Sequence, residues 1–332
     1  MSALSRRQVG TLLALMGLTA VACLLRYTID RDPMTGALSL AFPASDYAAY
    51  RFTSLAVGLI VGMALATSGV LLQALLRNPL AEPFILGLSN GAGLGVMIAL
   101  YFAYQTGGTA DPSATRTLPA VAGSLVTLAL VYSLGQRRGV LDPISLVLIG
   151  VIISAVCGVA IVFLQHLLPT GVRSQFTSWL MGLIPEAIAK RPLILAALVT
   201  VFGLVVGVCM GRAMDAATLG DDEARSVGLA VGPLRASLFV LAGVLAAMTV
   251  ALAGPIGFVG LIAPHVARLM MGPKHGPLVI GAALAGAVLV VGSDVLRQAI
   301  DVGTGRMPIG IFTALIGGPT FIWLLLSGRG QS

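Results

Sequence analysis

This 332-residue sequence consists largely of long apolar runs separated by short polar stretches. A helix needs about 20 apolar residues to cross a bilayer core. Only 10% of the residues are charged, whereas a soluble domain carries about a quarter, so a soluble globular enzyme is excluded. The sequence therefore predicts an all-α polytopic membrane protein, a single domain over residues 1–332 with about ten transmembrane helices. The expected spans are roughly 8–26, 51–76, 84–104, 118–136, 144–168, 191–212, 234–253, 255–271, 277–297 and 307–327.

The first apolar run could imitate a cleavable signal, because Ser5-Arg6-Arg7 precedes Leu12–Leu25. The run is too long for a typical signal core and many similar runs follow, so we interpret it as an uncleaved first span. An even number of spans places both termini on one side, which we expect to be the cytoplasm. Cytoplasmic loops carry an excess of Lys and Arg. The predicted inner side holds eleven of the 20 basic residues: Arg6, Arg7, Arg77, Arg137, Arg138, Arg212, Arg225, Arg235, Arg268, Lys274 and Arg329.

The net charge of +7 does not indicate nucleic-acid binding. The basic residues lie singly or in pairs between apolar runs, which is typical of loop anchoring in a membrane protein. The cysteines Cys23, Cys157 and Cys209 are isolated within apolar runs, a spacing that offers neither a disulfide framework nor a metal knuckle.

Ionisable residues are rare in the expected spans: Asp294 and Arg297 lie near the end of the ninth, and Arg51 begins the second. Proton- or sodium-coupled carriers usually need such a group inside the membrane, so an ion-coupled secondary transporter is the more distant alternative. Neither Lys190 nor Lys274 is followed by Ser or Thr, so the chain lacks a G-x-x-x-x-G-K-[ST] loop and a partner must bind ATP. The three histidines are dispersed, and we expect no catalytic site, metal site or bound cofactor.

Arg77-Asn78-Pro79-Leu80-Ala81-Glu82-Pro83 opens a motif that continues to Gly95. Its two prolines stop the preceding helix, Asn78 suits a cap, and Arg77 complements the negative end of the helix dipole. The glycines near Gly91 contain a G-x-G pattern. No strand–helix alternation surrounds them, so the pattern does not indicate a dinucleotide site.

The stretch Leu219–Gly228 is the longest polar insertion between spans. Asp221 can cap a short helix, Asp222 and Glu223 suit its positive first turn, and Gly228 can end it. A short, well-capped helix displayed to the cytoplasm indicates docking to a partner, and a plain solvated loop is the alternative.

Glycines and the prolines Pro255 and Pro264 interrupt the stretch Ala253–Leu269. This pattern predicts a broken or kinked segment that is packed against protein or lines a cavity. His265 and Arg268 share a helix face. With no carboxylate or second histidine near His265 in sequence, we interpret the pair as helix-end structure rather than a metal site. A fourth stretch, Gly305–Pro319, forms a proline-led entry to the last span.

In order and in residue types, these four stretches resemble the permease subunits of bacterial binding-protein-dependent ABC importers for heme, iron-siderophores and cobalamin, the FecCD family. The resemblance covers Arg51 to Leu326. It implies a type II ABC importer fold of the cobalamin-permease kind and a homodimer in the inner membrane. It also implies two ATPase subunits, which use ATP and Mg, and a periplasmic substrate-binding protein.

The resemblance implies roles for particular residues. Segment 213–233 corresponds to the cytoplasmic coupling loop that fits into a cleft of the ATPase, and its expected contacts are Asp221, Asp222, Glu223 and Arg225. The family often begins the second span with R-x-P-R, whose arginines face glutamates of the binding protein. Here Arg51-Phe52-Thr53-Ser54 keeps only the first arginine. Arg297 and Arg306 are further expected docking charges, although the family usually has an acidic or neutral residue at the position of Arg306.

The family's translocation path is lined mainly by the fifth and tenth spans at the dimer axis. The expected lining residues of the fifth span are Ser145, Leu146, Ile149 and His166. His166 could touch a heme iron transiently; an interfacial histidine at a helix end is the alternative that we favour. We expect heme as the substrate, because Gly305–Pro319 and the short outer loops resemble heme permeases. Ferric siderophore and cobalamin are the alternatives.

Overall fold

The computed structural model describes residues 5–31, 37–107, 112–300 and 307–328. Within these ranges each expected span contains one long helix, which confirms the predicted helical membrane architecture. Seven of these helices are long and apolar enough to cross a membrane on their own. The long helices are α1 (Arg6–Thr28), α2 (Ser45–Leu76), α3 (Leu88–Gln105), α4 (Pro112–Leu134), α5 (Pro143–His166), α7 (Lys190–Cys209), α10 (Val231–Ala253), α11 (Val259–Met271), α12 (His275–Ala299) and α13 (Ile309–Gly328).

Short elements connect the long helices. The predicted helix in the polar insertion is present as α9 (Asp221–Ser226). The other short helices are η1 (Pro83–Leu86), α6 (Thr170–Leu180) and α8 (Gly211–Ala217). Two antiparallel hairpins pair β1 (Ile29–Arg31) with β2 (Leu38–Leu40), and β3 (Gln136–Arg137) with β4 (Val140–Leu141).

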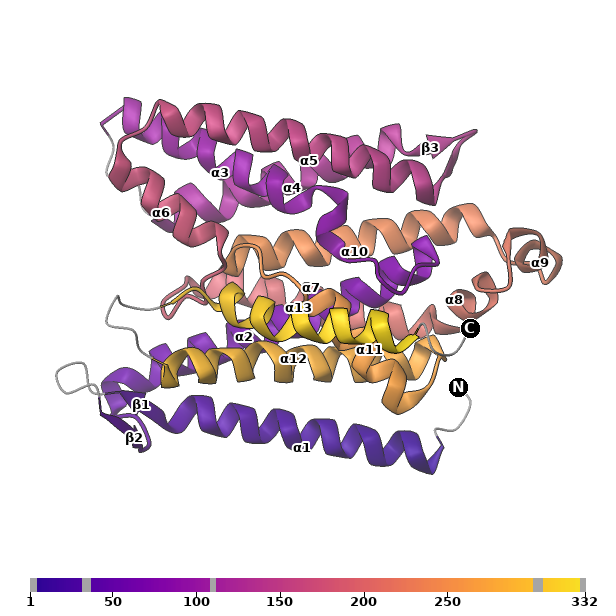
Figure 1. Ribbon diagram of the computed structural model, residues 1–332, viewed down its shortest axis with the longest axis horizontal. Helices are drawn as coiled ribbons and strands as arrows, with labels where there is room; N and C mark the ends of the chain where they lie inside the picture. The colour runs from indigo at the N-terminus through magenta and orange to yellow at the C-terminus, as the bar shows by residue number, and fades with distance from the viewer. Residues whose placement is uncertain (1–4, 32–36, 108–111, 301–306, 329–332) are drawn as a thin grey trace.

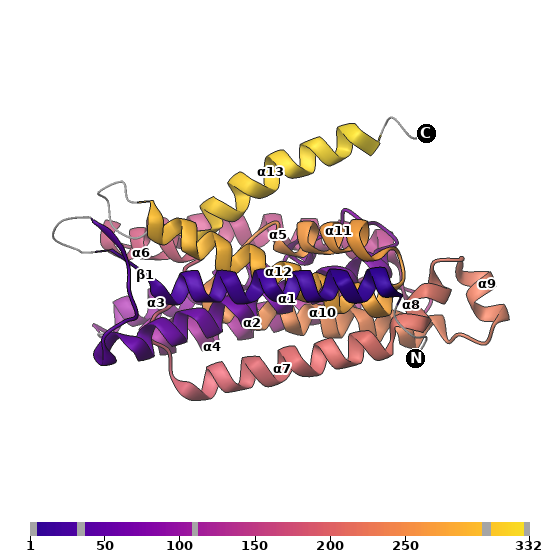
Figure 2. The ribbon, with the colours of Figure 1, turned by 90° about the horizontal axis from the view of Figure 1, so that it is seen from below.

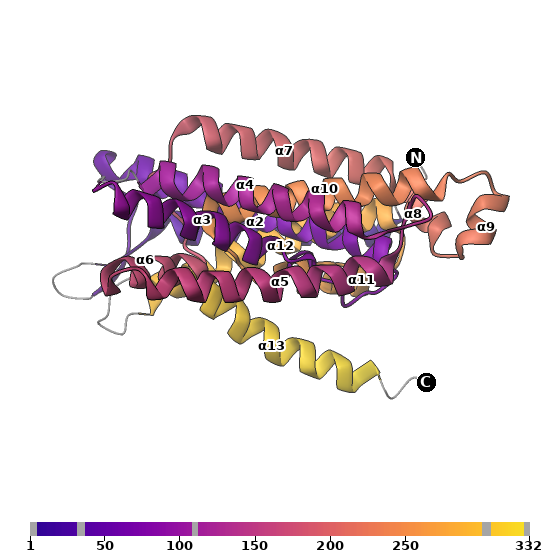
Figure 3. The same cartoon turned by 90° about the horizontal axis from the view of Figure 1, so that it is seen from above.

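The long helices run roughly along one direction, so the bundle has two ends (Figure 1). One end, called the α9 end below, carries α8, α9 and the β3–β4 hairpin, and the opposite end carries α6 and the β1–β2 hairpin. The start of α1 and the end of α13 both lie at the α9 end, as an even number of membrane crossings predicts. Figures 2 and 3 show α13 diverging from one side of the bundle and α7 lying on the opposite side.

The centre of the bundle is formed by α2, α10 and α12. In the most apolar stretch of these helices 72%, 72% and 67% of the residues are buried, against 11% in α1. Glycine allows α2 and α12 to pack closely, because a Cβ atom on Gly286 would overlap the carbonyl oxygen of Gly62. In lipid, such close backbone packing supplies the attraction between helices. The glycines of these spans therefore have a packing role at this crossing.

The predicted break near Pro255 is confirmed. The helix α10 ends at Ala253, α11 begins at Val259, and the residues between them are not helical. With 13 residues, α11 is about 20 Å long, shorter than the bilayer core of about 30 Å. The broken segment is packed inside protein, since the Leu183 amide donates to the Ala253 carbonyl oxygen at 2.7 Å.

A buried charge cluster joins α1 to α12. The Asp294 carboxylate accepts hydrogen bonds from Arg26 Nε and, at 2.8 Å, from Arg297 Nε. All three side chains are almost fully buried. The sequence located Asp294 and Arg297 near a span end, but it did not identify Arg26 as their partner on another helix.

Candidate functional site

Asp221 fixes α9 to the end of the bundle. Arg235 Nη2 donates to both of its carboxylate oxygens at 2.9 Å, and Arg77 Nη2 forms an ion pair with Oδ1 at 2.5 Å. Arg235 lies in the first turns of α10 and Arg77 follows the end of α2, so one carboxylate joins three elements. Asp221, expected to contact an ATPase, is thus bonded to arginines of its own chain.

The other charged residues of α9 face solvent. The Asp222 and Arg225 side chains are 94% and 58% exposed and form a long ion pair at 3.4 Å, and Glu223 is also exposed. Leu219 and Val227, which flank the helix, are 64% and 65% exposed. Because α9 projects beyond the bundle (Figure 1), it displays both charged and apolar side chains. The prediction from sequence considered only the charges and missed the two apolar residues.

The motif after α2 meets the broken segment inside the bundle. The Phe258 amide donates to Glu82 Oε1 at 2.5 Å. Gln73 Nε2 donates to the Gly260 carbonyl oxygen at 3.4 Å, and Arg268 Nη2 donates to Gln73 Oε1 at 3.1 Å. Glu82 thus satisfies an amide of the broken segment, and Gln73 satisfies the carbonyl of Gly260, which the amide-lacking Pro264 leaves free in the first turn of α11. The interpretation of Arg268 as a structural residue agrees with this contact.

Glu82 lies between α2 and α3, outside the helices. Burial raises the pKa of its carboxyl above the ordinary value, while the hydrogen bond from the Phe258 amide acts in the opposite direction. Phe258 has a φ angle of +69°, which a residue with a side chain rarely adopts. A cavity of about 360 Å³ adjoins both residues and is lined by Leu80, Glu82, Phe84, Ile85, Phe258, Leu261 and Phe321.

The three expected docking arginines differ in their placement. Arg51 Nη1 donates to the carbonyl oxygens of Tyr27 and Ile29 at 3.0 Å each, and Nη2 pairs with Asp30, which holds Arg51 against the β1 hairpin. Arg297 is buried in the cluster with Asp294, so it is not exposed for docking. Arg306 lies outside the described residues.

The four expected path residues lie along α5. The Ser145 hydroxyl donates to Asp142 at 2.7 Å within the helix cap. Leu146 is fully buried in the core of the chain, so it is not exposed toward a path, and Ile149 is half-buried against the same core. His166 is exposed at the last turn, with Nδ1 2.9 Å from the Val162 carbonyl oxygen. The exposed apolar face of α5 is instead formed by Ile144, Leu148, Val151, Ile152, Val156, Val159, Val162 and Phe163.

The described residues around His166 do not form a metal site. Within the described ranges, no group of three or more His, Cys, Asp or Glu side chains could hold a metal ion. The His275 imidazole pairs with Asp215 at 2.7 Å where α12 begins beside α8.

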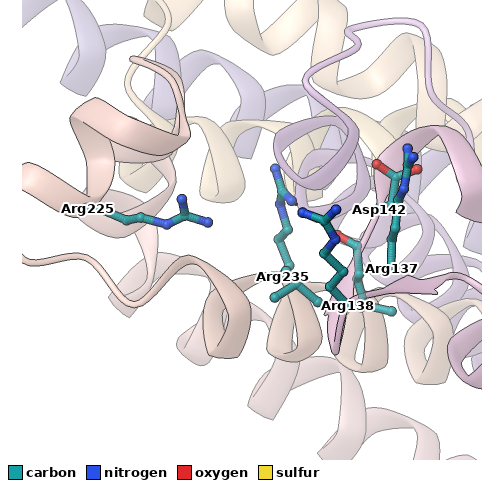
Figure 4. Close-up of a pocket in the computed structure, with 7 residues that line it drawn as sticks. Arg137, Arg138, Asp142, Arg225 and Arg235 are labelled. Atoms are coloured by element: carbon teal, nitrogen blue, oxygen red, sulfur yellow. Dashed lines mark hydrogen bonds between the residues drawn. The ribbon is translucent and has the colours of Figure 1, made fainter.

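A basic cavity, called the arginine pocket below, lies between α9 and the β3–β4 hairpin. It has a volume of about 440 Å³ and is lined by Arg137, Arg138, Val140, Leu141, Asp142, Arg225 and Arg235. Figure 4 shows the Arg225 side chain pointing from α9 toward Arg235 and Arg138. Hydrogen bonds from the Ser145 hydroxyl and amide lower the pKa of Asp142, and the charges of Arg137 and Arg235 lower it further.

Comparison with known proteins agrees with this architecture. The profile of the FecCD transport family matches residues 10–327. The hemin transport system permease protein HmuU of Yersinia pestis is 35% identical over 283 residues, which cover 85% of this chain and 83% of that protein. The vitamin B12 import system permease protein BtuC of Escherichia coli O9:H4 is 36% identical over 271 residues, which cover 82% of this chain and 80% of that protein.

A solved structure supports the same assignment. An inward-facing ABC transporter assigned to the metal-chelate type matches with a TM-score of 0.83 and 28% identity, covering 96% of this chain and 99% of the other. The region matched by the family profile, residues 10–327, contains α9, the broken segment between α10 and α11, and all of the ten long helices except the first residues of α1 and the last residue of α13. The chain is an ABC permease that belongs to the FecCD transport family.

Proposed function

We propose that this chain is the transmembrane subunit of an ATP-driven importer that moves heme across the inner membrane of a bacterium. The observation that carries the proposal is the 35% identity to a hemin permease over 85% of the chain. The similar identity of 36% to a vitamin B12 permease supports cobalamin as the alternative substrate, and ferric siderophore is a further one.

The proposed importer contains two copies of this chain, two ATPase subunits and a periplasmic binding protein. Because the sequence lacks a phosphate-binding loop for ATP, hydrolysis falls to the ATPase subunits. They dock on α9, which projects from the bundle and exposes Asp222, Glu223 and Arg225 together with two apolar side chains. The exposed apolar face of α5 supports its proposed place at the axis between the two copies.

In the proposed orientation the α9 end is cytoplasmic and the β1–β2 hairpin faces the periplasm. Arg51 lies at that hairpin, but its side chain is only 11% exposed and is bonded to Asp30 and to two carbonyl oxygens, whereas Lys190 and Arg191 at the start of α7 are exposed. The arginines Arg77, Arg137, Arg138, Arg225 and Arg235 gather at the α9 end, as the excess of basic residues in cytoplasmic loops requires.

The test is substrate uptake into proteoliposomes that contain this chain with its cognate ATPase and binding protein. Heme, a ferric siderophore and cobalamin are offered separately, with and without ATP. We expect ATP-dependent accumulation of heme, and its loss in an Asp222→Ala/Glu223→Ala variant that still folds. Uptake of only siderophore or only cobalamin would contradict heme while keeping the importer, whereas uptake without the ATPase would contradict the mechanism itself.

A further inference from the structure

The lining of the arginine pocket carries more positive than negative charge. Four guanidinium groups and one carboxylate line it. The carboxylate of Asp142 is occupied as the cap of α5, where it accepts bonds from the Ser145 amide and hydroxyl at 2.8 and 2.7 Å. Arg235 is occupied by Asp221 and by the Leu141 carbonyl oxygen at 3.1 Å. The remaining arginines are exposed, and an anion from outside the chain can reach them.

Three arginines of the pocket retain unused donors. Among the described residues, Arg137 and Arg138 form neither an ion pair nor a side-chain hydrogen bond, and Arg225 has only its long, exposed pair with Asp222. Arg138 also has a φ angle of +55° in the hairpin turn, a conformation that side chains other than Asn and Asp rarely adopt. Guanidinium groups bind phosphate oxygens through paired N–H donors, so this pocket suits a phosphate group.

An apolar surface adjoins the pocket. Val126, Leu130 and Leu134 are exposed at four-residue intervals and therefore lie on one face of α4, which leads directly into Arg137. A free phosphate ion does not bind apolar side chains, whereas a phospholipid places its acyl chains on apolar helices next to a basic headgroup site.

We propose that the arginine pocket binds the phosphate of an anionic phospholipid in the leaflet at the α9 end, with the acyl chains along α4. Arg137 and Arg138 contact the phosphate from the hairpin, and Arg225 contacts it from α9. The lipid thereby links α9 to the β3–β4 hairpin between α4 and α5. This link is independent of the bonds from Asp221 to Arg77 and Arg235. The position of α9 then depends on membrane composition.

The test compares thermal unfolding of the full chain in nanodiscs of phosphatidylcholine with and without phosphatidylglycerol. The pocket variant is Arg137→Gln/Arg138→Asn, in which Asn tolerates the left-handed turn. The matched control, Arg6→Gln/Arg212→Gln, removes two exposed arginines outside the pocket. We expect phosphatidylglycerol to raise the melting temperature of the wild type and the control equally, and that of the pocket variant much less. Native mass spectrometry should show roughly tenfold weaker phosphatidylglycerol retention in the pocket variant.

Equal melting temperatures in pure phosphatidylcholine establish that the pocket variant folds, and Arg225→Gln provides a second variant on the other wall. Equal losses in the pocket variant and the control, or no response to phosphatidylglycerol, would overturn the proposal. Inorganic phosphate added to phosphatidylcholine nanodiscs distinguishes a lipid phosphate from a soluble one. If inorganic phosphate alone raised the melting temperature as much as phosphatidylglycerol does, the ligand would be a soluble anion. A shift that appears only when the ATPase is added would mean that an acidic side chain of the partner occupies the pocket.

Discussion

Asp221 holds α9 through two arginines that come from different elements, and each pair is about one third exposed or less. We predict that Asp221→Asn leaves both arginines without a countercharge and makes local opening of α9 easier by about 1–2 kcal/mol, a value already reduced for solvent screening. Amide hydrogen exchange of residues 221–226 measures this opening. The bundle helices should keep their protection, because the bond lies at the edge of the fold.

Asp222→Asn is the matched control, because Asp222 is the neighbouring residue and its side chain is 94% exposed. It removes the same charge from α9 but leaves the bonds to Arg77 and Arg235 intact. Exchange in this control should equal that of the wild type. Equal acceleration in both variants would show that net charge, rather than the Asp221 bonds, holds the helix.

Removing the charge of Asp294 is predicted to reduce stability more, because its carboxylate is buried between two arginines. Asp294→Asn leaves Arg26 and Arg297 as uncompensated buried charges, which should destabilise the chain by about 3–5 kcal/mol. Thermal unfolding in detergent measures the change. Asp46→Asn, an exposed carboxylate in the first turn of α2, should leave the melting temperature nearly unchanged. A similar melting temperature for both variants would contradict the role of the cluster.

At this scale the sequence predicts which residues are charged, but not which residues pair or which residue caps each helix: α2 ends at a left-handed Arg77 rather than at the expected cap Asn78. The short helix was expected and is present, but Asp221 does not cap it: Gly220 is the N-cap, and the Asp221 carboxylate is bonded to Arg77 and Arg235 instead. Its partner Arg77 lies 144 residues away, and Arg26 lies 268 residues from Asp294. No local periodicity connects residues at such separations, because the pairing is created by how the helices pack.

Among the elements, α2 and α12 show most directly how small residues set a helix crossing. We predict that Gly286→Ala destabilises the chain by about 1–3 kcal/mol, because the added methyl group would overlap the Gly62 backbone and force the helices apart. Gly292→Ala in the same helix is the control, since nothing lies within 4 Å of its Cβ position. Thermal unfolding distinguishes them, and equal melting temperatures would contradict close packing at Gly286.

The long helices could be predicted from sequence because each needs an apolar run, and the run itself is the signal. The break between α10 and α11 could be predicted because Pro255 and its glycines cannot continue a helix. The helix α6 and the two short hairpins were not predicted. α6 mixes polar and apolar residues, and each hairpin strand has three residues or fewer, too short for a recognisable alternation.

The whole molecule has two chemically different ends. The α9 end carries the arginine pocket, the Asp221 bonds and the start of α1, and the other end carries the β1–β2 hairpin. The count of basic residues from sequence favoured one orientation only weakly, eleven against nine of the 20. The structure adds the grouping of arginines around one pocket, a feature of three-dimensional arrangement that a linear count does not contain.

The orientation can be measured with a membrane-impermeant maleimide and two single-cysteine variants in a background without Cys23, Cys157 and Cys209. Leu219→Cys lies at the α9 end and Phe42→Cys at the other, and the native side chains are 64% and 75% exposed. We predict that intact spheroplasts label only Phe42→Cys and inside-out vesicles label only Leu219→Cys. The reverse pattern would place α9 in the periplasm, out of reach of any ATPase. Labelling of both from one side would contradict the five crossings, α2, α3, α4, α5 and α7, that separate the two positions.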